Sequence, residues 1–479
     1  MELVWRFCPD GRDANPRKLM NAPISIAELL KETKSRCLVC QADVPAQVLK
    51  QGGAVWLRRE CPEHGTQESK ISSDDRFYWL SKGAAGCGEN CACRAADGEA
   101  AGSLGRNAGG APGLKETDGI ETVFESLSTC LALIEIVNSC NLRCPVCYAD
   151  SPWSRPAEID AVPLAEIQER VNAVIARKGR IEILQLSGGE PTLHPDFGVL
   201  LDWAQRHPGI DYVLLNTNGV RIARDDAFFA ELTHVFRRGK LQLYLQFDGV
   251  QEAAQLALRG ADLRKTREET LLRCGRIGLP VTLAMTVNSA NLPHLWEAVA
   301  FGLGRPEVRG ISFQPEFVTG RNPAILAMEE DPLNVADIIL AATGQSSGQL
   351  RITDFTPLPC GDPNCSVIGY LLRIDGVAHS VSKFVNFARL QGFLKNRVKY
   401  DLADLMQCGC ESEPLGALLK EFELDESQTF RLFIKPFMDA RSWDADRIDR
   451  CCTHVIRPDG KLDSFCRYYA NGGASGLNR

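Results

Sequence analysis

The sequence lacks long apolar runs and any excess of positive charge. No stretch approaches the roughly 20 apolar residues of a membrane-spanning helix, and the first residues hold no apolar segment typical of a signal peptide. Lysine and arginine number 54 against 61 aspartates and glutamates, so the net charge of −7 offers no basic face for nucleic acid. We therefore expect a cytoplasmic protein that neither binds nucleic acid nor spans a membrane, although peripheral contact with a membrane surface stays compatible with this composition.

Cysteine, by contrast, is abundant, with 19 residues among 479. Thiols stay reduced in the cytoplasm, so these cysteines are expected to be metal ligands rather than disulfide partners. The 44% hydrophobic and 24% charged residues are typical of a globular protein. The length predicts about two to four domains.

Three cysteines follow an apolar run at residues 131–137 that predicts a buried strand. They are spaced as Cys140-x3-Cys144-x2-Cys147, with Tyr148 directly after the last one. An iron–sulfur cluster ordinarily takes four thiolates, so three closely spaced ligands predict a [4Fe–4S] cluster with one open iron. A zinc knuckle and buried structural thiols are the alternatives, since short cysteine motifs often mislead.

The middle of the chain, residues 128–350, alternates short apolar segments with longer amphipathic ones. This alternation is typical of an α/β fold with a parallel sheet. The predicted strands are residues 131–137, 181–186, 212–216, 241–247, 281–287 and 310–314, and the predicted helices include residues 164–177, 198–206, 228–237 and 292–302. Six such units predict a partial (β/α)6 barrel, in which active sites gather at the carboxyl ends of the strands.

Polar motifs stand at those predicted strand ends. The second strand runs into Ser187 and then the motif 188–191, where two glycines allow close approach of the backbone and a carboxylate can hold an amine. A plain strand-end turn is the alternative. The candidate residues at these ends are Gly188, Gly189, Glu190, Pro191, Asn216, Asn218, Asp248 and Gln314.

Together these motifs resemble the radical S-adenosylmethionine (SAM) superfamily. The resemblance implies that Cys140, Cys144 and Cys147 hold the catalytic cluster, whose open iron binds the amino and carboxylate groups of SAM. It further implies that the Gly-Gly-Glu-Pro motif binds the SAM amine and that the backbone at Tyr148 meets the adenine. The reduced cluster would cleave SAM to methionine and a 5′-deoxyadenosyl radical, which abstracts hydrogen from a substrate.

The first 86 residues predict a small metal-binding module. Cys37-x2-Cys40 is followed twenty residues later by Cys61-x2-His64, a spacing typical of a zinc ribbon or of a rubredoxin-like iron site. His64 is the weakest of the four, because it could be a turn residue while a fourth thiolate comes from elsewhere.

The remaining cysteines predict two further [4Fe–4S] clusters. The first uses Cys87, Cys91, Cys93 and Cys130, in a segment 87–127 that contains a Gly/Ala-rich insert at 94–117, expected to be flexible. The second belongs to residues 351–479 and uses Cys360, Cys365, Cys452 and Cys466, with Cys408, Cys410 and Cys451 as substitutes. The alternative is a set of scattered reduced thiols. We expect Cys8 and Cys274 to be structural.

Most of the chain resembles one branch of the superfamily, the archaeal tetraether lipid synthases and their relatives described as dihydropterin methylases. The shared features include Val44-Pro45-Ala46, Thr129-Cys130, Gly320-Arg321 and Cys451-Cys452-Thr-His454. This branch implies the SAM cluster, two auxiliary clusters and one mononuclear zinc or iron. One departure is that the first auxiliary segment reads C-x3-C-x-C before an insert, where the family has C-x3-C-x2-C.

The resemblance implies hydrogen abstraction from an unactivated carbon, with electrons from a donor such as flavodoxin or ferredoxin. Carbon–carbon bond formation on an isoprenoid lipid is the first hypothesis, and methyl transfer to a pterin-type small molecule is the alternative. Modification of a peptide and a non-catalytic iron–sulfur electron carrier are further alternatives. A long apolar channel would favour a lipid, and a short polar pocket would favour a pterin.

Overall fold

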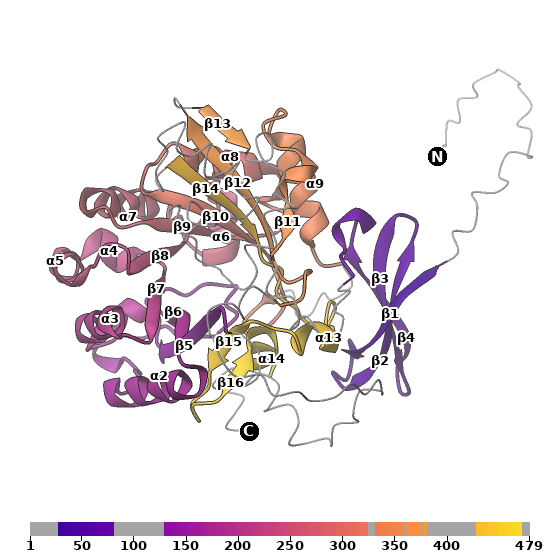
Figure 1. The fold of residues 1–479 in the computed structure, drawn as a ribbon, viewed down its shortest axis with the longest axis horizontal. Coiled ribbons are helices and arrows are strands. Elements are labelled where there is room, and N and C mark those ends of the chain that lie inside the picture. Colours follow the sequence, from indigo (N-terminus) through magenta and orange to yellow (C-terminus); the bar gives the residue numbers. More distant parts are fainter. Residues whose placement is uncertain are drawn as a thin grey trace, which may run out of the picture.

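The computed structural model describes residues 27–80, 129–323, 331–358, 361–374, 377–380 and 428–471. Several predictions concern residues outside these ranges, namely the insert 94–117 and Cys8, Cys87, Cys91, Cys93, Cys360, Cys408 and Cys410. The described residues form two sheets, a small one of four strands near the N-terminus and a large one of twelve strands (Figure 1).

The small sheet is antiparallel and has four strands in the order β1-β2-β3-β4. Its strands are β1 (Glu28–Arg36), β2 (Asp43–Gln51), β3 (Ala54–Cys61) and β4 (Gly65–Ser72). Gly52 and Gly53 form the turn between β2 and β3 with φ values of 61° and 79°, which favour glycine in a tight hairpin. Val48, Val55 and Leu57 are fully buried and make the core of this module.

Six parallel strands form the centre of the large sheet, as predicted. They are β5 (Leu131–Val137), β6 (Ile181–Gly188), β7 (Ile210–Thr217), β8 (Leu241–Gln246), β9 (Val281–Val287) and β10 (Val308–Pro315), in that spatial order. The predicted strands therefore exist, and β6, β7 and β10 are longer than expected by two or more residues. The α/β fold with a partial (β/α)6 barrel is confirmed.

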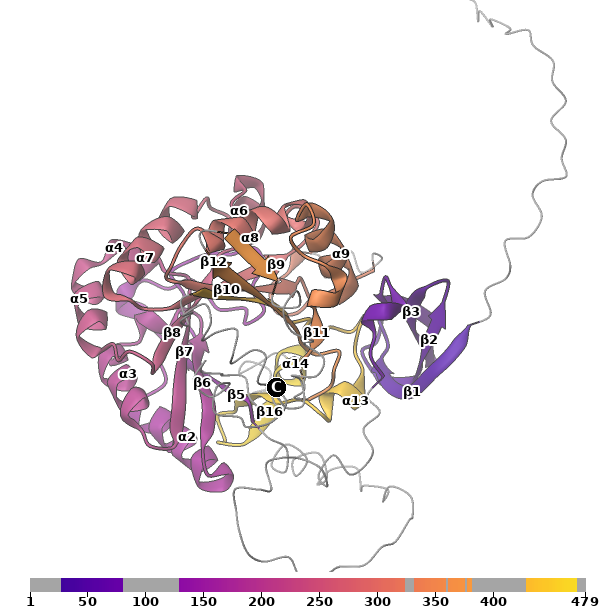
Figure 2. The same cartoon turned by 45° about the horizontal axis from the view of Figure 1, so that its top comes forward.

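Helices cover the outer side of these strands in an arc (Figure 2). The predicted ones appear as α2 (Leu164–Lys178), α3 (Phe197–Arg206), α5 (Asp226–Val235) and α8 (Leu295–Leu303), and α4 (Val220–Arg224), α6 (Glu252–Arg259), α7 (Arg264–Ile277) and α9 (Val335–Gln345) join them. Helix α2 shows why they pack: Ile167, Val171 and Val174 lie on one face and are fully buried. The helix predicted at 292 begins with a 3-10 turn, η5 (Leu292–His294), that contains Pro293.

The sheet does not end near residue 350, where we expected the barrel to finish. Strand β14 (Thr429–Ile434) pairs in parallel with β10, and β15 (Thr453–Ile456) pairs in parallel with β5. Antiparallel strands β11 (Thr356–Pro357), β12 (Val367–Ile374) and β13 (Val377–Ser380) lie beyond β14, and β16 (Leu462–Ser464) lies beyond β15. The C-terminal region thus extends both edges of the barrel sheet, which spacing along the chain could not indicate.

The small module contacts the C-terminal segment around α13 (Ala445–Ile448), which precedes β15 and α14 (Phe465–Ala470). Lys31 forms an ion pair with the buried Asp444 at 2.7 Å. The fully buried Arg59 donates to the carbonyl oxygen of Ala440 at 3.0 Å. No helix among the described residues is long and apolar enough to cross a membrane.

Candidate active site

The loop after β5 carries the three cysteines of the central motif and is fixed by backbone hydrogen bonds. The amide of Cys140 donates to the carbonyl of Pro152 at 2.8 Å. Cys147 and Arg321 exchange two backbone hydrogen bonds at 2.7 and 2.9 Å, and the Arg321 side chain donates to the carbonyl of Cys144 at 2.9 Å. The loop is therefore held from two sides before any ligand binds.

Gly320 is required by this arrangement. Its φ is 59°, and a Cβ atom there would lie 2.5 Å from the carbonyl oxygens of both Cys147 and Tyr148. Only glycine fits so close to the cysteine loop. Gly320 and Arg321 were among the residues that carried the resemblance. In the structure they pack against the cysteine loop and bind its backbone.

Gly188 and Gly189 serve a similar packing purpose. A Cβ atom on Gly188 would lie 2.1 Å from the carbonyl oxygen of Val137, and one on Gly189 would lie 2.1 Å from that of Ser139. The amides of Gly189 and Glu190 donate to those same two carbonyls at 2.8 and 3.0 Å. We had expected the glycines to let a ligand approach. They also line the cavity, yet the contact that excludes a side chain is with the backbone of the cysteine loop.

Glu190 is buried and its carboxylate accepts four hydrogen bonds from protein groups. Oε1 accepts from the Thr192 amide at 3.2 Å and from the Thr192 and Thr217 hydroxyls, each at 2.7 Å. Oε2 accepts only from the amide of Asn218, at 2.8 Å. A carboxylate oxygen has two lone pairs, so Oε2 keeps an acceptor site for a ligand amine. Burial raises the pKa of Glu190, and the hydrogen bonds oppose that rise.

All three cysteines line one cavity of about 780 Å³ together with Gly188, Gly189 and Glu190. Burial, together with the nearby Glu190 carboxylate, raises the pKa of the Cys140 thiol to about 12. Thiolates are thus disfavoured there unless a cation compensates, as iron would. A three-thiolate cluster with an open iron fits this donor set, and the free acceptor site of Glu190 fits the SAM amine.

Asp248 takes a different place from the one we expected. It is fully buried and does not line the cavity, and it binds Arg259 through two hydrogen bonds of 2.6 and 2.8 Å. Its φ of 62° is in the left-handed region. Burial alone would lower the pKa of Arg259, but Asp248 and the thiol of Cys144 raise it. Asp248 therefore positions a guanidinium beside the cysteines instead of facing a cofactor. Pro191 does not line the cavity either.

The other predicted contacts do line the cavity. Tyr148 packs against Tyr469 with ring centroids 4.7 Å apart, and its hydroxyl accepts from Asn216 at 3.4 Å. Asn218 donates to Asn141 inside the cysteine loop at 2.7 Å. Gln314 donates to the hydroxyl of Tyr244 at 2.7 Å. The strand-end residues meet at one edge, as the barrel topology requires.

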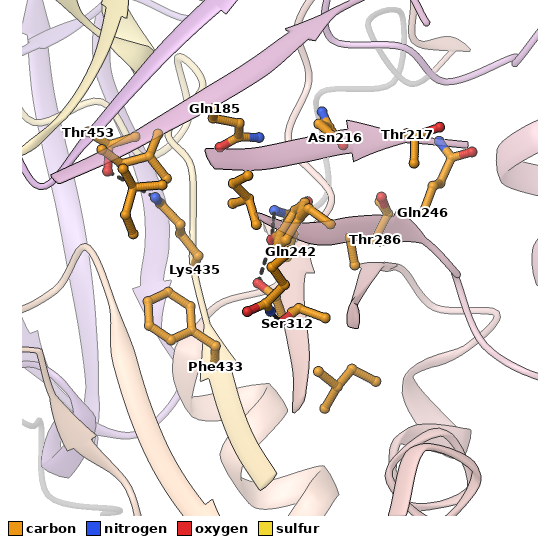
Figure 3. A pocket seen from close by; sticks show the side chains of 18 of the residues that line it. Gln185, Asn216, Thr217, Gln242, Gln246, Thr286, Ser312, Phe433, Lys435 and Thr453 are labelled. Carbon is orange, nitrogen blue, oxygen red and sulfur yellow. Dashed lines mark hydrogen bonds between the residues drawn. The ribbon is translucent and has the colours of Figure 1, made fainter. Parts of the chain in front are cut away.

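Below this edge the barrel interior is an open cavity whose wall mixes polar side chains with apolar ones such as Ile183, Leu214 and Ile311. Figure 3 shows Gln185, Gln242, Gln246, Thr286 and Ser312 around the cavity. Hydrogen bonds tie these groups into layers: Tyr244 donates to Ser312 at 2.7 Å, and Tyr212 donates to Gln242 at 3.2 Å. The interior of an ordinary (β/α)8 barrel is closely packed by branched apolar residues, whereas this interior is open and offers amide and hydroxyl groups to a ligand.

The predicted ligands of the N-terminal module come together in a compact cage. Cys37, Cys40, Cys61 and His64 place one ligand atom each within 4.8 Å of all the others. The Cys40 and Cys61 sulfurs are 3.9 Å apart, and the His64 Nδ1 lies 3.6 and 3.4 Å from the sulfurs of Cys37 and Cys61. A tetrahedral ion with zinc-like bond lengths requires about 3.8 Å between sulfurs and about 3.6 Å between sulfur and nitrogen. The cage therefore fits a zinc or iron ion.

The C-terminal cysteines that the structure describes are also neighbours. Burial raises the pKa of Cys451, and the adjacent thiols of Cys452, Cys365 and Cys466 raise it further. Cys130 lies next to Cys452, because the amides of Cys130 and Leu131 donate to the Cys452 carbonyl at 3.1 and 3.3 Å. Residues that we had assigned to two different auxiliary clusters thus sit side by side. Cys274, by contrast, is fully buried in the helical layer, as expected of a structural thiol.

Several residues of the site were not foreseen from the sequence. Thr217 holds Glu190, and Arg259 reaches the cysteine loop from helix α6. Glu135 is buried in β5 and accepts hydrogen bonds of 2.8 Å from Tyr468 and Tyr469. Thr217 stood within the Asn-Thr-Asn-Gly motif and could have been found there. Arg259 and the two tyrosines follow no spacing rule, because only folding brings them to their partners.

Comparisons with protein families agree with this geometry. Residues 134–301 match the model of the radical SAM superfamily, and residues 29–73 match that of the HMPTM N-terminal zinc ribbon domain. The chain is 24% identical to the 7,8-dihydro-6-hydroxymethylpterin dimethyltransferase of Methanocaldococcus jannaschii, covering 91% of this chain and 93% of that enzyme. It is 28% identical to the GTP 3′,8-cyclase of Synechococcus elongatus, covering 39% of this chain and 59% of that enzyme.

Among solved structures, Streptococcus suis SuiB bound to S-adenosylmethionine matches with a TM-score of 0.37 and 16% identity, over 45% of this chain and 46% of that one. SuiB bound to the precursor peptide SuiA matches with a TM-score of 0.39 and 12% identity, over 74% and 61%. The family matches, the thiol-lined cavity at the strand ends and the Gly-Gly-Glu-Pro geometry agree with one another. Residues 134–301 therefore form a radical SAM domain, which follows an N-terminal zinc ribbon domain at residues 29–73.

Proposed function

We propose that this enzyme cleaves one molecule of SAM reductively, uses the resulting radical to abstract hydrogen from a small polar heterocycle of the pterin type, and transfers to that heterocycle a methyl group from a second molecule of SAM, which leaves as S-adenosylhomocysteine. The amide and hydroxyl groups that line the same cavity as the three cysteines are the observation that carries this proposal. Similarity to the pterin dimethyltransferase over nearly the whole of both chains supports it.

The cavity favours a pterin over an isoprenoid chain, which had been our first hypothesis from the sequence. A hydrocarbon chain gains from an apolar wall along its whole length, and buried amide or hydroxyl groups without polar partners are costly. Here Gln185, Gln242 and Gln246 line the interior. The aromatic side chains of Phe317 and Phe437 also line the cavity, with ring centroids 5.3 Å apart.

At the rim of the cavity, where the strand ends and the cysteine loop lie, different residues would have different roles. Cys140, Cys144 and Cys147 would hold a [4Fe–4S] cluster, and Glu190 would accept a hydrogen bond from the SAM amine. The reduced cluster with bound SAM supplies a 5′-deoxyadenosyl radical. Arg259, fixed by Asp248, keeps a positive charge beside the Cys144 thiolate, and the close-packed glycines keep the loop from moving.

We further propose two auxiliary [4Fe–4S] clusters, a mononuclear zinc or iron in the N-terminal cage, and a flavodoxin or ferredoxin as the electron donor. The neighbouring thiols of Cys365, Cys452 and Cys466 support the second auxiliary cluster. The position of Cys130 beside Cys452 supports a first auxiliary cluster close to the second one.

The test is anaerobic reconstitution of the full chain, reduction with dithionite, and incubation with SAM and 7,8-dihydro-6-hydroxymethylpterin. We expect the pterin to accelerate formation of 5′-deoxyadenosine and to gain mass in units of one methyl group, measured by liquid chromatography and mass spectrometry. Isoprenoid phospholipid in vesicles serves as the comparison substrate. If lipid, and not the pterin, accelerates SAM cleavage, the pterin assignment is wrong.

A further inference from the structure

Strand β14 presents two basic side chains to the barrel interior. Thr429, Arg431, Phe433 and Lys435 all line the cavity, whereas the intervening Phe430, Leu432 and Ile434 are buried in the core on the other face. Strand β14 lies outside residues 134–301, which match the radical SAM family model. These two cations are therefore additions to the part of the barrel that serves SAM.

Neither cation is paired with a carboxylate. Among the described residues, no acidic oxygen lies within ion-pair distance of Arg431 or Lys435, and the acids that line the cavity are Glu190 and Glu316 at the rim. Lys435 donates to the hydroxyl of Thr453 at 2.9 Å, as Figure 3 shows. A partly buried cation without a counter-charge is unfavourable, so an anion that enters the cavity is stabilised.

Arg431 belongs to a polar network in the deeper part of the interior. The Nε2 of Gln242 donates to the hydroxyl of Thr282. The Oε1 of Gln242 accepts from Arg431 at 3.5 Å and from the hydroxyl of Tyr212 at 3.2 Å. A guanidinium carries five N–H donors. Among the described residues, Arg431 donates one hydrogen bond, to Gln242 Oε1 at 3.5 Å. Guanidinium donors that face a cavity are typical of an anion site.

The register of the strands gives the depth of this site. Arg431 pairs with Gly310, near the beginning of β10, and Lys435 follows the end of β14 at the carboxyl edge. Four residues of strand separate them by about 13 Å. Arg238 and Arg309 line the same deep end of the cavity, so the positive charge increases away from the cysteines.

We propose that the substrate carries an anionic group, a phosphate ester or a carboxylate, that Arg431 binds deep in the barrel while the reacting carbon lies at the cysteine rim. This inference rests on the proposed function, because it names the substrate class of the same cavity. A neutral heterocycle would bring no negative charge to Arg431, whose hydrogen bond among the described residues is the long one to Gln242. A heterocycle with an anionic side chain would place its ring at the cysteine rim and its negative charge beside Arg431.

Binding without turnover tests the proposal. Inorganic pyrophosphate and glutarate, as probes for phosphate and carboxylate, are titrated calorimetrically into the reconstituted full-length enzyme with SAM present. We expect at least one of them to bind, Arg431→Gln to weaken its binding at least tenfold, and Arg431→Lys to weaken it less because the charge remains. Arg206→Gln, which changes an exposed arginine on α3, should leave binding unchanged.

The preferred probe distinguishes the two chemical classes. Failure of both probes to bind the wild-type enzyme, or equal binding by the wild type and Arg431→Gln, would overturn the proposal. Basal formation of 5′-deoxyadenosine is measured in every variant and should remain, which shows that the fold and the SAM site are intact. Loss of anion binding with normal SAM cleavage therefore separates this inference from the proposed function.

Discussion

The N-terminal cage and the rim of the barrel, where the strands end and the cysteine loop lies, both contain a Cys-x2-Cys spacing, but the two sites suit different purposes. In the module, two loops of an antiparallel sheet bring four ligand atoms within 4.8 Å, which leaves no place for another ligand. At the rim, three cysteines lie on one loop that faces a cavity of about 780 Å³. A closed set of four is suited to a structural ion, and an open set of three is suited to chemistry.

The cysteine pKa values of the two sites are shifted in opposite directions, which agrees with this difference. Burial alone would raise the pKa of Cys37, but hydrogen bonds from the amides of Cys40 and Val39 and from neighbouring thiols lower it to about 6. Burial, with a smaller contribution from Glu190, raises the pKa of Cys140 to about 12. The module thus holds a thiolate ready for a cation, whereas the rim becomes ionised only when a cluster supplies positive charge.

Removal of one rim cysteine should have the largest effect. Cys144→Ala is expected to abolish 5′-deoxyadenosine formation, because two thiolates cannot hold a cluster with a defined open iron. About two thirds of the cluster iron should remain if two auxiliary clusters are present. Iron analysis and chromatography of the reaction products measure both quantities. Loss of all cluster iron would show that the rim and auxiliary sites do not assemble independently.

Breaking the buried ion pair at the rim should cost stability. Asp248→Asn removes the counter-charge of Arg259 and is expected to lower the free energy of unfolding by about 3–5 kcal/mol. Asparagine tolerates the left-handed φ of position 248, so the loss reports on charge and not on backbone strain. Chemical denaturation measures the difference.

A surface pair provides the control for this experiment. Asp202→Asn removes a surface carboxylate that pairs with Arg206 and Arg237, and it should cost less than about 1 kcal/mol for each pair. Equal losses for the two variants would mean that the buried pair has no special importance for the rim.

The affinity for SAM should depend on the charge of Glu190. Glu190→Gln replaces a charged hydrogen bond to the SAM amine by a neutral one and should weaken binding by about 2 kcal/mol, or about thirtyfold. Because burial raises the pKa of Glu190, its carboxylate becomes protonated at a higher pH than an ordinary glutamate. Wild-type affinity should therefore fall as the pH decreases from 7 toward 5.

Equilibrium dialysis with labelled SAM across this pH range measures the effect. The Glu190→Gln variant supplies the control, since it has no carboxylate to protonate and its affinity should change little with pH. Parallel pH profiles for the wild type and the variant would exclude Glu190 as the group that binds the amine.

The smallest effect on catalysis is expected from the module. Cys40→Ser should remove the single ion of the cage, measured by metal analysis, while SAM cleavage stays within about twofold of the wild type because the sites are separate. Cys144→Ala should keep that ion. A large loss of SAM cleavage in Cys40→Ser would mean that the cage takes part in the reaction or in electron delivery.

The features that could be predicted from the sequence are those set by residues close together in the chain. Cys140, Cys144 and Cys147 must lie close together because a few bonds connect them, and the same holds for Gly189 and Glu190. The six strands and the helices between them follow from apolar periodicity, which is also a local property. Partners that are distant in the chain left no such signal. Asp248 looked like a cofactor contact because its neighbour Arg259 enters from a separate helix.

The sequence by itself determined the ligand types of the described metal sites and the order of strands and helices, since both depend on residues close together in the chain. The tertiary structure alone decided what surrounds them. Parallel pairing of β15 with β5 sets Cys130 beside Cys452, more than 300 residues away, and pairing of β14 with β10 turns Arg431 into the cavity. Strand pairing fixes which side chains share an interior, and that pairing is a property of the whole fold.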